Sequence, residues 1–405
     1  MARTLVVVGG SYAGAQVVAS ARAAGHDGPI RLVADEPHLP YQRPPLSKGF
    51  LLGKVEADAL PIRVEAFYRE NDIDLALGSR AVAIDRIARR VETADGSRIP
   101  YDRLVLATGA APRLPPVPGI DRAGVVALRN LDDAIMVRDR LPEVGDVVVI
   151  GGGYIGLEVA SALATLGKRV TVLEAGDRLL ARASAPLALH VAGIHRARGV
   201  DLRLRTTAAA IRGEGDRVTG VETSDGTVLP ADLVVVGIGV VPRTQLAEAA
   251  GLPCEDGIVV DRFASTADPA ILAAGDCSRH PSAFAGRSLR LESVQHAVDQ
   301  AKTAGTVAAG RPTPYEAVPW FWSDQFDLKL QMVGLAEGWT RHVVRGDPES
   351  GRFSFFYYRD DRLVAIDSVN RPGDHIAGRR LLTAGRSPTP EEAADGGFDL
   401  RAAGA

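Results

Sequence analysis

Three glycines with a regular spacing, Gly151, Gly153 and Gly156, lie in the middle of the chain. Each glycine of such a GxGxxG pattern has its own role when a dinucleotide binds. The first allows a tight turn, the second lets the backbone approach a pyrophosphate, and the third lets a helix pack closely on a strand. Glu174 follows at the spacing where an acidic side chain accepts hydrogen bonds from ribose hydroxyls. These residues predict dinucleotide binding.

A strand, a helix and a second strand must position these glycines. Branched apolar residues from Val147 run into Gly151, a helix-compatible stretch continues to Leu166, and Gly167 ends it. The apolar sequence VTVL then leads to Glu174. The stretch is a complete βαβ unit in which the helix N-terminus faces a phosphate. The alternative is an ordinary strand–loop–helix without a ligand.

The start of the chain repeats this pattern. The strand-like Leu5–Val8 precedes GGSYAG, so that Gly9 and Gly14 match Gly151 and Gly156, whereas Ser11 stands where Gly153 does. Serine is small and its hydroxyl can face a phosphate, so we again expect a nucleotide site, with a plain strand turn as the alternative. The second strand ends in Asp35 and Glu36, either of which could hold a ribose. Two nucleotide folds imply two nucleotides with different roles.

Composition excludes several classes of function. The net charge of −3 favours neither nucleic acid nor an anionic membrane as a partner. The longest apolar run, Leu233–Val241, is far shorter than the roughly 20 residues that span a bilayer. Cys254 and Cys277 form no CxxC pair and no zinc spacing, so we expect no metal site and a reducing compartment, the cytoplasm.

The rest of the chain supplies further elements. The pattern predicts helices over residues 61–71, 130–141 and 293–309, with a long helical segment after Glu174. Strands are predicted within 72–99, 104–109, 233–242 and 257–277, with hairpin turns at Asp95-Gly96 and Asp225-Gly226. Prolines make residues 38–48 a loop and make 111–119 a crossover between domains. Residues 319–384 are aromatic-rich and alternate as an antiparallel sheet does, and residues 386–405 are predicted to form a mobile tail.

These elements define an α/β fold with two Rossmann-type nucleotide-binding domains, one inserted in the other, plus a C-terminal α+β domain. The outer domain is predicted to comprise residues 1–112 and 243–312, because ILAAGDC resumes the first pattern after the insertion. The inserted domain then comprises residues 113–242, and the C-terminal domain comprises residues 313–405.

The motifs GGSYAG, HLPYQRPPLSK, LVLATGAAPR, GGGYIGLEVA, ILAAGDC, LRLESVQHAVDQAK and PWFWSDQ occur in this order. Over residues 1 to about 390 the chain thereby resembles the ferredoxin reductases of bacterial monooxygenase and dioxygenase systems, within the pyridine nucleotide-disulfide oxidoreductase superfamily. The resemblance implies a glutathione reductase-like architecture in which the outer fold binds FAD, the inserted fold binds NADH and the third domain completes the flavin site. Single electrons then pass to a two-iron ferredoxin that serves a haem-thiolate monooxygenase or a Rieske-type dioxygenase.

The resemblance also assigns roles to residues. Lys48 and Glu158 correspond to a catalytic pair beside the flavin ring, Asp276 to a ribityl-binding aspartate, and Trp322 to a tryptophan near the flavin. Ser293 and Val294 begin a helix whose N–H groups and dipole would stabilise negative charge on a reduced flavin. The full set of expected cofactor-binding residues is Gly9, Ser11, Ala13, Gly14, Asp35, Glu36, Lys48, Ala81, Thr108, Gly109, Arg129, Asp276, Ser293, Val294, Trp322, Gly151, Gly153, Tyr154, Ile155, Gly156, Glu158, Glu174, Gly237 and Gly239.

Two-iron ferredoxins are acidic, so a reductase of this kind should present local basic residues to them. Arg63 and Lys302 match basic docking positions of the family, with solvated charges as the alternative. We expect a monomer or weak homodimer, and the composition predicts neither a nucleic-acid nor a membrane partner. Glu174 predicts a preference for NADH, and Arg178 is the nearest counter-signal because an arginine can receive a 2′-phosphate.

Two other functions share this architecture. A flavoprotein disulfide reductase or NADH oxidase would need a CxxC, or a lone cysteine in the loop after the first glycine motif, and the sequence has neither. A redox-responsive interaction protein similar to apoptosis-inducing factor would bring targeting and basic segments, which are also missing. Ser11 and Tyr12 depart from the common family pattern.

Overall fold

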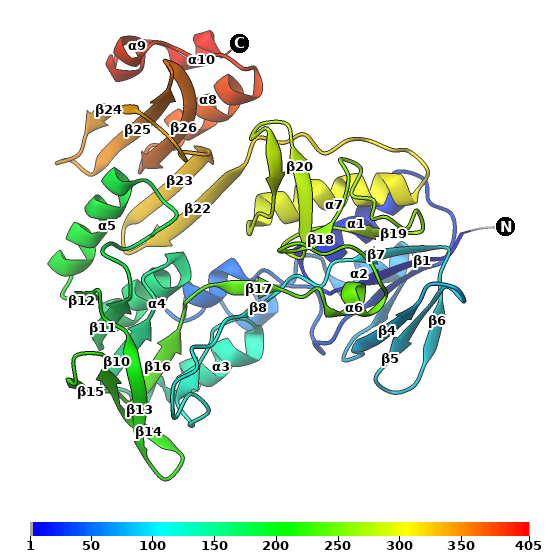
Figure 1. Cartoon of the computed structure of the whole chain (residues 1–405), viewed down its shortest axis with the longest axis horizontal. Coiled ribbons are helices and arrows are strands. Elements are labelled where there is room, and N and C mark those ends of the chain that lie inside the picture. The colour runs from blue at the N-terminus through cyan, green and yellow to red at the C-terminus, as the bar shows by residue number, and fades with distance from the viewer. Residues whose placement is uncertain (1–2, 405) are drawn as a thin grey trace. The chain divides into compact units, whose positions relative to one another are not determined.

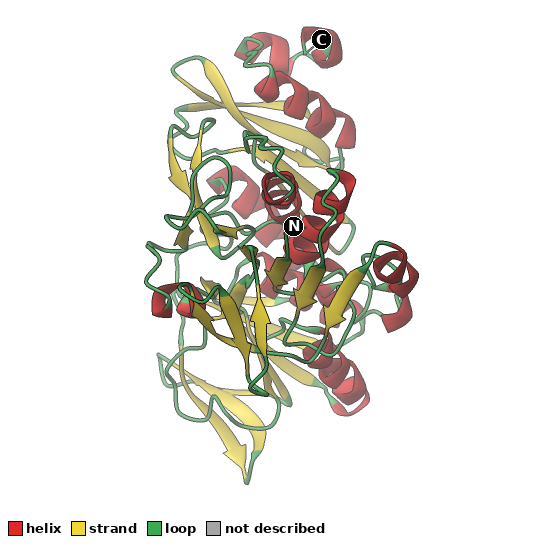
Figure 2. Cartoon of the chain, turned by 90° about the vertical axis from the view of Figure 1, so that its right-hand side faces the viewer, coloured by secondary structure: helices red, strands yellow, loops and turns green. Residues whose placement is uncertain are grey.

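The computed structural model describes residues 3–404, so the predicted domain limits at residues 1 and 405 lie outside the described residues. The chain forms two compact units, each built from several segments (Figure 1). Unit 1 comprises residues 1–42, 58–111 and 241–319, and unit 2 comprises residues 43–57, 112–240 and 320–405. The chain contains both helices and strands (Figure 2).

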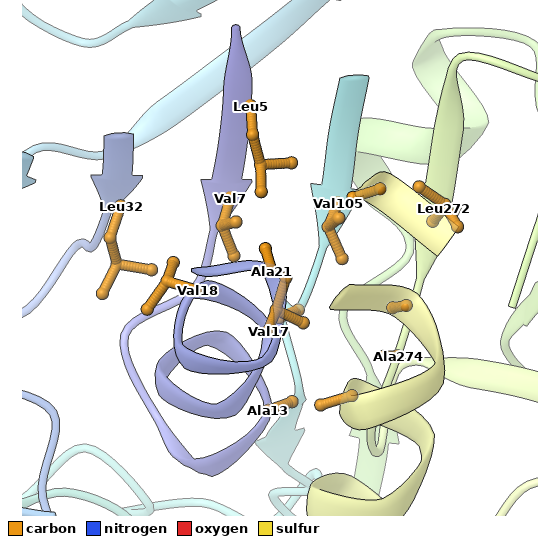
Figure 3. Close-up of a cluster of buried hydrophobic side chains, with 14 of the residues drawn as sticks. Leu5, Val7, Ala13, Val17, Val18, Ala21, Leu32, Val105, Leu272 and Ala274 are labelled. Atoms are coloured by element: carbon orange, nitrogen blue, oxygen red, sulfur yellow. The ribbon is translucent and has the colours of Figure 1, made fainter. Parts of the chain in front are cut away.

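Unit 1 is built around a parallel sheet in the order β19-β7-β1-β2-β3. Its strands are β1 (Leu5–Val8), β2 (Ile30–Val33), β3 (Ile73–Ala76), β7 (Arg103–Leu106) and β19 (Ile271–Ala273). Both faces are covered, which explains why β1 reads as an unbroken apolar run. Helix α1 (Tyr12–Ala23) packs Val17 and Ala21 against Val7, and α7 (Val294–Ala308) joins the same core (Figure 3). As predicted, the segment after the insertion returns to this first sheet.

Smaller elements complete unit 1. Two further three-stranded sheets have the orders β4-β5-β6 and β18-β20-β21. Their strands are β4 (Ala81–Asp85), β5 (Arg90–Thr93), β6 (Arg98–Pro100), β18 (Ile258–Val259), β20 (Ser278–Ser282) and β21 (Arg287–Leu289). The short helices are η2 (Ala57–Ala59), α2 (Glu65–Glu70) and α6 (Gln245–Ala249). The predicted turn at Asp95-Gly96 connects β5 to β6.

Unit 2 contains a second parallel sheet, in the order β12-β11-β10-β16-β9. Its strands are β9 (Val125–Val126), β10 (Asp146–Ile150), β11 (Arg169–Glu174), β12 (Asp201–Leu204) and β16 (Leu233–Val236). The helices of this part are η1 (Pro44–Ser47), α3 (Leu131–Arg140), η3 (Leu141–Glu143), α4 (Tyr154–Thr165) and α5 (Ala185–Ala197). An antiparallel sheet of β13 (Ala208–Glu214), β14 (Arg217–Thr223) and β15 (Val228–Pro230) contains the predicted hairpin at Asp225-Gly226.

The aromatic-rich C-terminal segment forms an antiparallel sheet, as predicted, in the order β22-β23-β26-β25-β24. The strands are β22 (Trp320–Gln325), β23 (Leu328–Gly334), β24 (Arg341–Asp347), β25 (Arg352–Arg359) and β26 (Arg362–Val369). Helix α8 (Pro372–Thr383) packs against β26 and β23. The sheet is held by buried aromatic side chains of β25, among them Phe353, Phe356 and Tyr357.

The structure corrects the bounds of two predicted elements. The helix expected over residues 61–71 spans only Glu65–Glu70, because Ile62 donates its N–H to Pro40 and keeps the preceding residues extended. The strand expected over residues 233–242 divides into β16 and β17 (Val240–Pro242), because Gly239 has a φ of +97°. Strand β17 pairs with β8 (Ala110–Pro112) where the chain passes between the units.

The segment expected to be a mobile tail instead contains α9 (Pro390–Ala394) and α10 (Leu400–Ala403). Arg345 is buried and its guanidinium donates to the carbonyl oxygens of Ala393, Asp395, Gly396 and Phe398. Thr389 and Glu392 form a capping box at the start of α9. The sequence did not predict these contacts, because polar groups make them and the pattern of apolar residues does not mark them.

None of the helices formed by residues 3–404 has the length and apolar character that a bilayer-spanning helix needs.

Candidate functional site

The turn between β10 and α4 has the geometry of a phosphate cradle. Gly151 has a φ of +110°, and a Cβ atom there would lie 2.5 Å from the carbonyl oxygen of Gly237. At Gly156 a Cβ would lie 2.2 Å from the carbonyl oxygen of Gly151. At Gly153, in contrast, the nearest atom is 3.7 Å away, so the protein itself leaves room for a side chain. We conclude that this room suits a ligand that approaches the backbone, as a pyrophosphate does.

The start of α4 supports the same conclusion. Its N-cap residue is Gly153, which has no side chain to accept from the first N–H groups, and the first turn contains no acidic residue. Helix α3, by comparison, has a complete capping box formed by Asn130 and Asp133. Free N–H groups and the positive end of the helix dipole favour an anion at α4. Ile155 is exposed at this helix start.

The cradle lies where a ligand site is expected in an open α/β sheet. Strand β10 pairs with β11 on one side and with β16 on the other. The strand order changes direction beside β10, so this is the topological switch point of the sheet. Glu174 ends β11, and its carboxylate accepts from the N–H of Gly152 at 2.8 Å and of Gly176 at 2.7 Å. The guanidinium of Arg178 donates to the carbonyl oxygens of Ala181 and Ala183. Glu174 is therefore fixed beside the cradle, and Arg178 is engaged with backbone.

The first glycine motif forms an equivalent turn in unit 1. Gly9 has a φ of +123°, and a Cβ atom at Gly14 would lie 1.8 Å from its carbonyl oxygen. Ser11 is the N-cap residue of α1 with extended backbone, and Ala13 is buried in the first turn. Strand β1 lies between β2 and β7, again the place where the connections reverse. The residues present thus fit a second dinucleotide.

The two acids after β2 have different surroundings. Asp35 pairs with Arg243 at 3.0 Å and both side chains are 43% exposed, so this pair is a weak restraint. Glu36 accepts from the hydroxyl of Tyr41 at 2.5 Å. Arg243 also contacts the β7 loop, because its N–H donates to Gly109 and its carbonyl accepts from Thr108 at 2.6 Å.

The loop that carries Asp276 is held by α7. The side-chain oxygen of Gln300 accepts from the N–H of Gly275 at 2.8 Å and from the hydroxyl of Ser278 at 2.7 Å. Ser293 caps α7 by accepting from the N–H of His296 at 3.1 Å. The helix thus begins at Val294, as predicted, and fixes the Asp276 loop near its first turns.

A buried ion pair lies in unit 2. The ammonium of Lys48 lies 2.7 Å from the carboxylate of Glu158, whose side chain is only 5% exposed. The hydroxyls of Ser47 and Ser323 donate to the same carboxylate at 2.5 and 2.6 Å. Lys48 also donates to the carbonyl of Pro44 at 3.2 Å. The structure brings the two predicted catalytic residues together, and their place beside a flavin remains a prediction.

The other predicted residues take more varied positions. Tyr154 opens α4, and its ring contacts Phe321 edge-on at a centroid distance of 4.8 Å. Trp322 follows in β22, with its ring 5.7 Å from that of Trp320. The carbonyl of Arg129 accepts from Arg43 at 2.7 Å. The remaining positions are Ala81 at the start of β4, and Gly237 and Gly239 in the loop after β16.

Burial shifts the pKa values of several groups outside the predicted site. Burial lowers the pKa of His280 to about 4 and of its stacking partner His296 to about 3. Burial raises the pKa of Asp367 to about 6, although hydrogen bonds from Ser184 and Tyr357 oppose that shift. His280 and His296 are therefore neutral at pH 7.

Burial also raises the pKa of both cysteine thiols, and neither cysteine forms a disulfide. Within residues 3–404 no group of three acidic, histidine or cysteine side chains could hold a metal ion.

Sequence reasoning missed the serines that hold Glu158. Ser47 and Ser323 lie inside the motifs HLPYQRPPLSK and PWFWSDQ, from which only the lysine and the tryptophan were singled out. Serine is common in loops and strand ends, so no spacing marked these two as partners of a helix residue more than a hundred positions away. Their neighbours Lys48 and Trp322 were the only available signal.

The chain belongs to the pyridine nucleotide-disulphide oxidoreductase family, whose model matches residues 3–301, and a reductase C-terminal model matches residues 320–404. It is 46% identical to rhodocoxin reductase of Rhodococcus erythropolis, over 99% of this chain and 94% of that protein. The crystal structure of the ferredoxin reductase for the CYP199A2 system from Rhodopseudomonas palustris superposes with a TM-score of 0.97 at 45% identity, covering all of both chains. The reductase in the covalent putidaredoxin reductase–putidaredoxin complex gives a TM-score of 0.95 at 41% identity, covering 99% of this chain and 98% of that one.

Proposed function

We propose that the protein is an NADH-dependent, FAD-containing ferredoxin reductase. The observation that carries the proposal is the presence of two glycine turns, each at the connection reversal of its own parallel sheet. Two such turns suit two dinucleotides, and relatives that match over nearly the whole chain are named as ferredoxin reductases. FAD, when bound, accepts a hydride from NADH and releases its two electrons singly.

The residues of the chain bind and orient these groups. The turn after β1 holds the pyrophosphate of FAD, and the turn after β10 holds that of NADH. Glu174 accepts from the ribose hydroxyls of NADH, since a carboxylate that already accepts two N–H groups retains further lone pairs. Asp276 holds the ribityl chain of FAD, and Val294 presents the start of α7 to the flavin ring.

Lys48 supplies a charged donor to the reaction. An ammonium has three N–H groups, and two of those on Lys48 are directed to Glu158 and Pro44. The third has no protein partner among the described residues, and we assign it to the flavin edge. Glu158 keeps the ammonium in place, because a buried cation without a counter-charge costs several kcal/mol.

The electron acceptor is a two-iron ferredoxin with an acidic surface, which in turn serves a haem-thiolate monooxygenase or a Rieske-type dioxygenase. Arg63 and Lys302 attract it. Lys302 is 55% exposed and pairs with Asp299 at 2.7 Å, a contact that solvent screens. The guanidinium of Arg63 lies 4.4 Å from the ring centre of Phe67, which holds it in one orientation. Opposite charge at such positions raises the association rate.

The proposal also assigns the domains. Residues 1–112 and 243–312 bind FAD, residues 113–242 bind NADH, and residues 313–405 complete the flavin site. The enzyme acts in the cytoplasm as a monomer or weak homodimer. Free thiols suit a reducing compartment, and their raised pKa values make them poor nucleophiles for disulfide chemistry.

Steady-state assay of the purified holoprotein tests this function. NADH, the protein and a two-iron ferredoxin are mixed with cytochrome c, and cytochrome c reduction is followed. We expect turnover that requires the ferredoxin and saturates with its concentration. Ferricyanide, which accepts electrons without docking, is the control for flavin reduction. Ferricyanide reduction without any ferredoxin-dependent turnover, across several two-iron ferredoxins, would contradict the proposal.

A further inference from the structure

A chain of buried polar side chains continues beyond the Lys48–Glu158 pair. Ser323 donates to Oε1 of Glu158 at 2.6 Å, and Gln325 Nε2 lies 3.1 Å from the Ser323 hydroxyl. Gln325 Oε1 lies 2.9 Å from Nε2 of His195, which belongs to α5. Ser323, Gln325 and His195 are each fully buried. The chain therefore connects α4, β22 and α5 without contact with solvent.

The direction of every hydrogen bond in this chain is determined. An ionised carboxylate only accepts, so Ser323 must give its one proton to Glu158. The group that faces the Ser323 hydroxyl must then donate, which places the amide nitrogen of Gln325 there. The amide oxygen of Gln325 consequently faces His195 and accepts, so His195 carries its proton on Nε2.

The far end of the chain agrees with this direction. Nδ1 of His195 is buried and has no hydrogen-bond partner among residues 3–404, which suits a nitrogen without a proton better than an N–H group. Burial lowers the pKa of His195, so the ring stays neutral near pH 7. A protonated ring would leave a buried N–H unsatisfied. His195 thus ends the chain as a donor only.

We propose that Ser323, oriented by Gln325, is a positioning residue that fixes the Glu158 carboxylate and thereby the Lys48 ammonium. The inference rests on the proposed role of that pair. Ser47 and Lys48 both bind Oε2 of Glu158, so among residues 3–404 it is Ser323 that holds Oε1. Without the serine hydroxyl the carboxylate can turn about its last bond, and the ammonium follows it.

Stopped-flow reduction of the holoenzyme by NADH tests the proposal. Ser323→Ala should lower the limiting rate of flavin reduction about tenfold and change the apparent Kd for NADH less than threefold. Ser161→Ala is the matched control, because Ser161 is also buried, in α4, but donates to the backbone carbonyl of Glu158. The control should stay within twofold of the wild type.

A double-mutant cycle separates positioning from general packing. In a Glu158→Ala background, Ser323→Ala should have almost no further effect on the limiting rate, because its only route to the reaction has been removed. The same tenfold loss in both backgrounds would overturn the proposal. A Ser323→Ala enzyme with the wild-type rate would also overturn it.

Nitrogen-15 NMR of histidine-labelled holoprotein gives a readout independent of turnover. His195→Gln identifies the His195 signal, which should show a neutral ring protonated on Nε2 at pH 7. In Ser323→Ala the Gln325 amide loses its acceptor, so the His195 signal should shift. A ring protonated on Nδ1, or a His195 signal unaffected by the substitution, would contradict the proposed chain of hydrogen bonds. If Lys48→Ala and Glu158→Ala both leave flavin reduction unchanged while the NMR results hold, the catalytic role of the pair fails and the positioning network stands.

Discussion

At the scale of single residues, the site depends on the hydrogen-bond partners of two charged groups, Glu158 and Lys48. Glu158 is almost completely buried and accepts from one ammonium and two hydroxyls. Lys48 contacts Glu158 and the carbonyl oxygen of Pro44, and we propose that its third N–H group faces the flavin. A buried ion pair of this kind adds little to stability compared with an apolar pair, so its presence in a core argues for function.

Lys48→Ala should therefore slow flavin reduction by NADH at least about tenfold while changing NADH binding much less. The reason is that, in the proposed mechanism, the ammonium orients the reacting groups and does not hold the nucleotide. Stopped-flow absorbance of the flavin measures both quantities. Lys54→Ala is the matched control, because Lys54 is an exposed lysine of the same segment. Equal reduction rates for wild type and Lys48→Ala would remove Lys48 from the mechanism.

The second residue-scale prediction concerns nucleotide choice. The carboxylate of Glu174 repels a 2′-phosphate, and the backbone contacts of Arg178 keep that arginine from compensating. We expect kcat/KM for NADH to exceed that for NADPH by at least about a hundredfold, and Glu174→Ser to reduce the ratio about tenfold. Steady-state kinetics with both nucleotides decides this. Equal values of kcat/KM for the two nucleotides would show that Glu174 has another role.

Residue types and spacing predicted the glycine turns and the acidic Glu174, because each has an unusual chemical requirement that is visible in the sequence. Lys48 and Glu158 were predicted from the resemblance to the ferredoxin reductases, and spacing alone does not indicate the pair. Ser47, Ser323 and Gln325 have no such requirement, because hydroxyl and amide groups serve equally well in turns and on surfaces. Their roles depend on tertiary contacts that only the structure reveals.

At the scale of elements, the turn between β10 and α4 separates the requirements of folding from those of binding. Gly151 has a positive φ and no space for a Cβ atom, whereas Gly153 has ordinary backbone and open space. The protein fold explains the first glycine and does not explain the second.

Gly153→Ala should consequently leave the thermal unfolding midpoint nearly unchanged and raise the Kd for NADH about tenfold or more, because the methyl group occupies the ligand's space. Calorimetry and nucleotide titration measure the two effects. Gly151→Ala is the contrasting variant and should destabilise the protein by several kcal/mol. Normal NADH binding by Gly153→Ala would mean that no pyrophosphate lies at this turn.

The positions of most strands and helices followed from apolar periodicity and from glycine and proline signals. The sequence predicted the ends of these elements less accurately. The helix at residues 61–71 lost its first turn to a hydrogen bond with Pro40, and the C-terminal segment gained two helices through Arg345. Both outcomes depend on residues far away in sequence, so local pattern could not supply them.

At the scale of the whole molecule, buried histidines predict sensitivity to acid. Burial lowers the pKa values of His280, His296 and His375, so the unfolded chain binds more protons below about pH 6.5. The free energy of unfolding should fall as pH falls from 6.5 towards 4. For His280 alone, the loss in the free energy of unfolding is on the order of 3 kcal/mol, at about 1.4 kcal/mol for each pKa unit. Chemical denaturation between pH 7.5 and 4 measures this loss, and His280→Gln should flatten the pH dependence of the free energy of unfolding.

Asp367 changes the pH dependence of stability in the opposite direction. Its pKa of about 6 lies above the unfolded value, so its contribution to stability is present at low pH and is lost as pH rises from about 4 through 6. Asp367→Asn should therefore steepen the acid loss. A flat stability profile in the wild type, unchanged by either substitution, would contradict these assignments.

Ferredoxin docking is the other property of the whole molecule. With a net charge of −3, attraction must come from local basic residues, and salt should weaken it over a Debye length of about 8 Å. Arg63→Glu and Lys302→Glu should each slow ferredoxin reduction several-fold at low salt and leave ferricyanide reduction intact. Arg90→Glu, at an exposed arginine of β5, controls for the change in net charge. Equal effects of all three substitutions would place the docking surface elsewhere.

In the proposed function the protein divides the electron pair of NADH between two ferredoxin molecules. Anaerobic stopped-flow measures this directly, with catalytic holoprotein, a limiting amount of NADH and an excess of oxidised two-iron ferredoxin. We predict that two ferredoxins are reduced for each NADH consumed, at a rate that saturates with ferredoxin. Consumption of NADH with a bleached flavin and ferredoxin left oxidised would contradict the account.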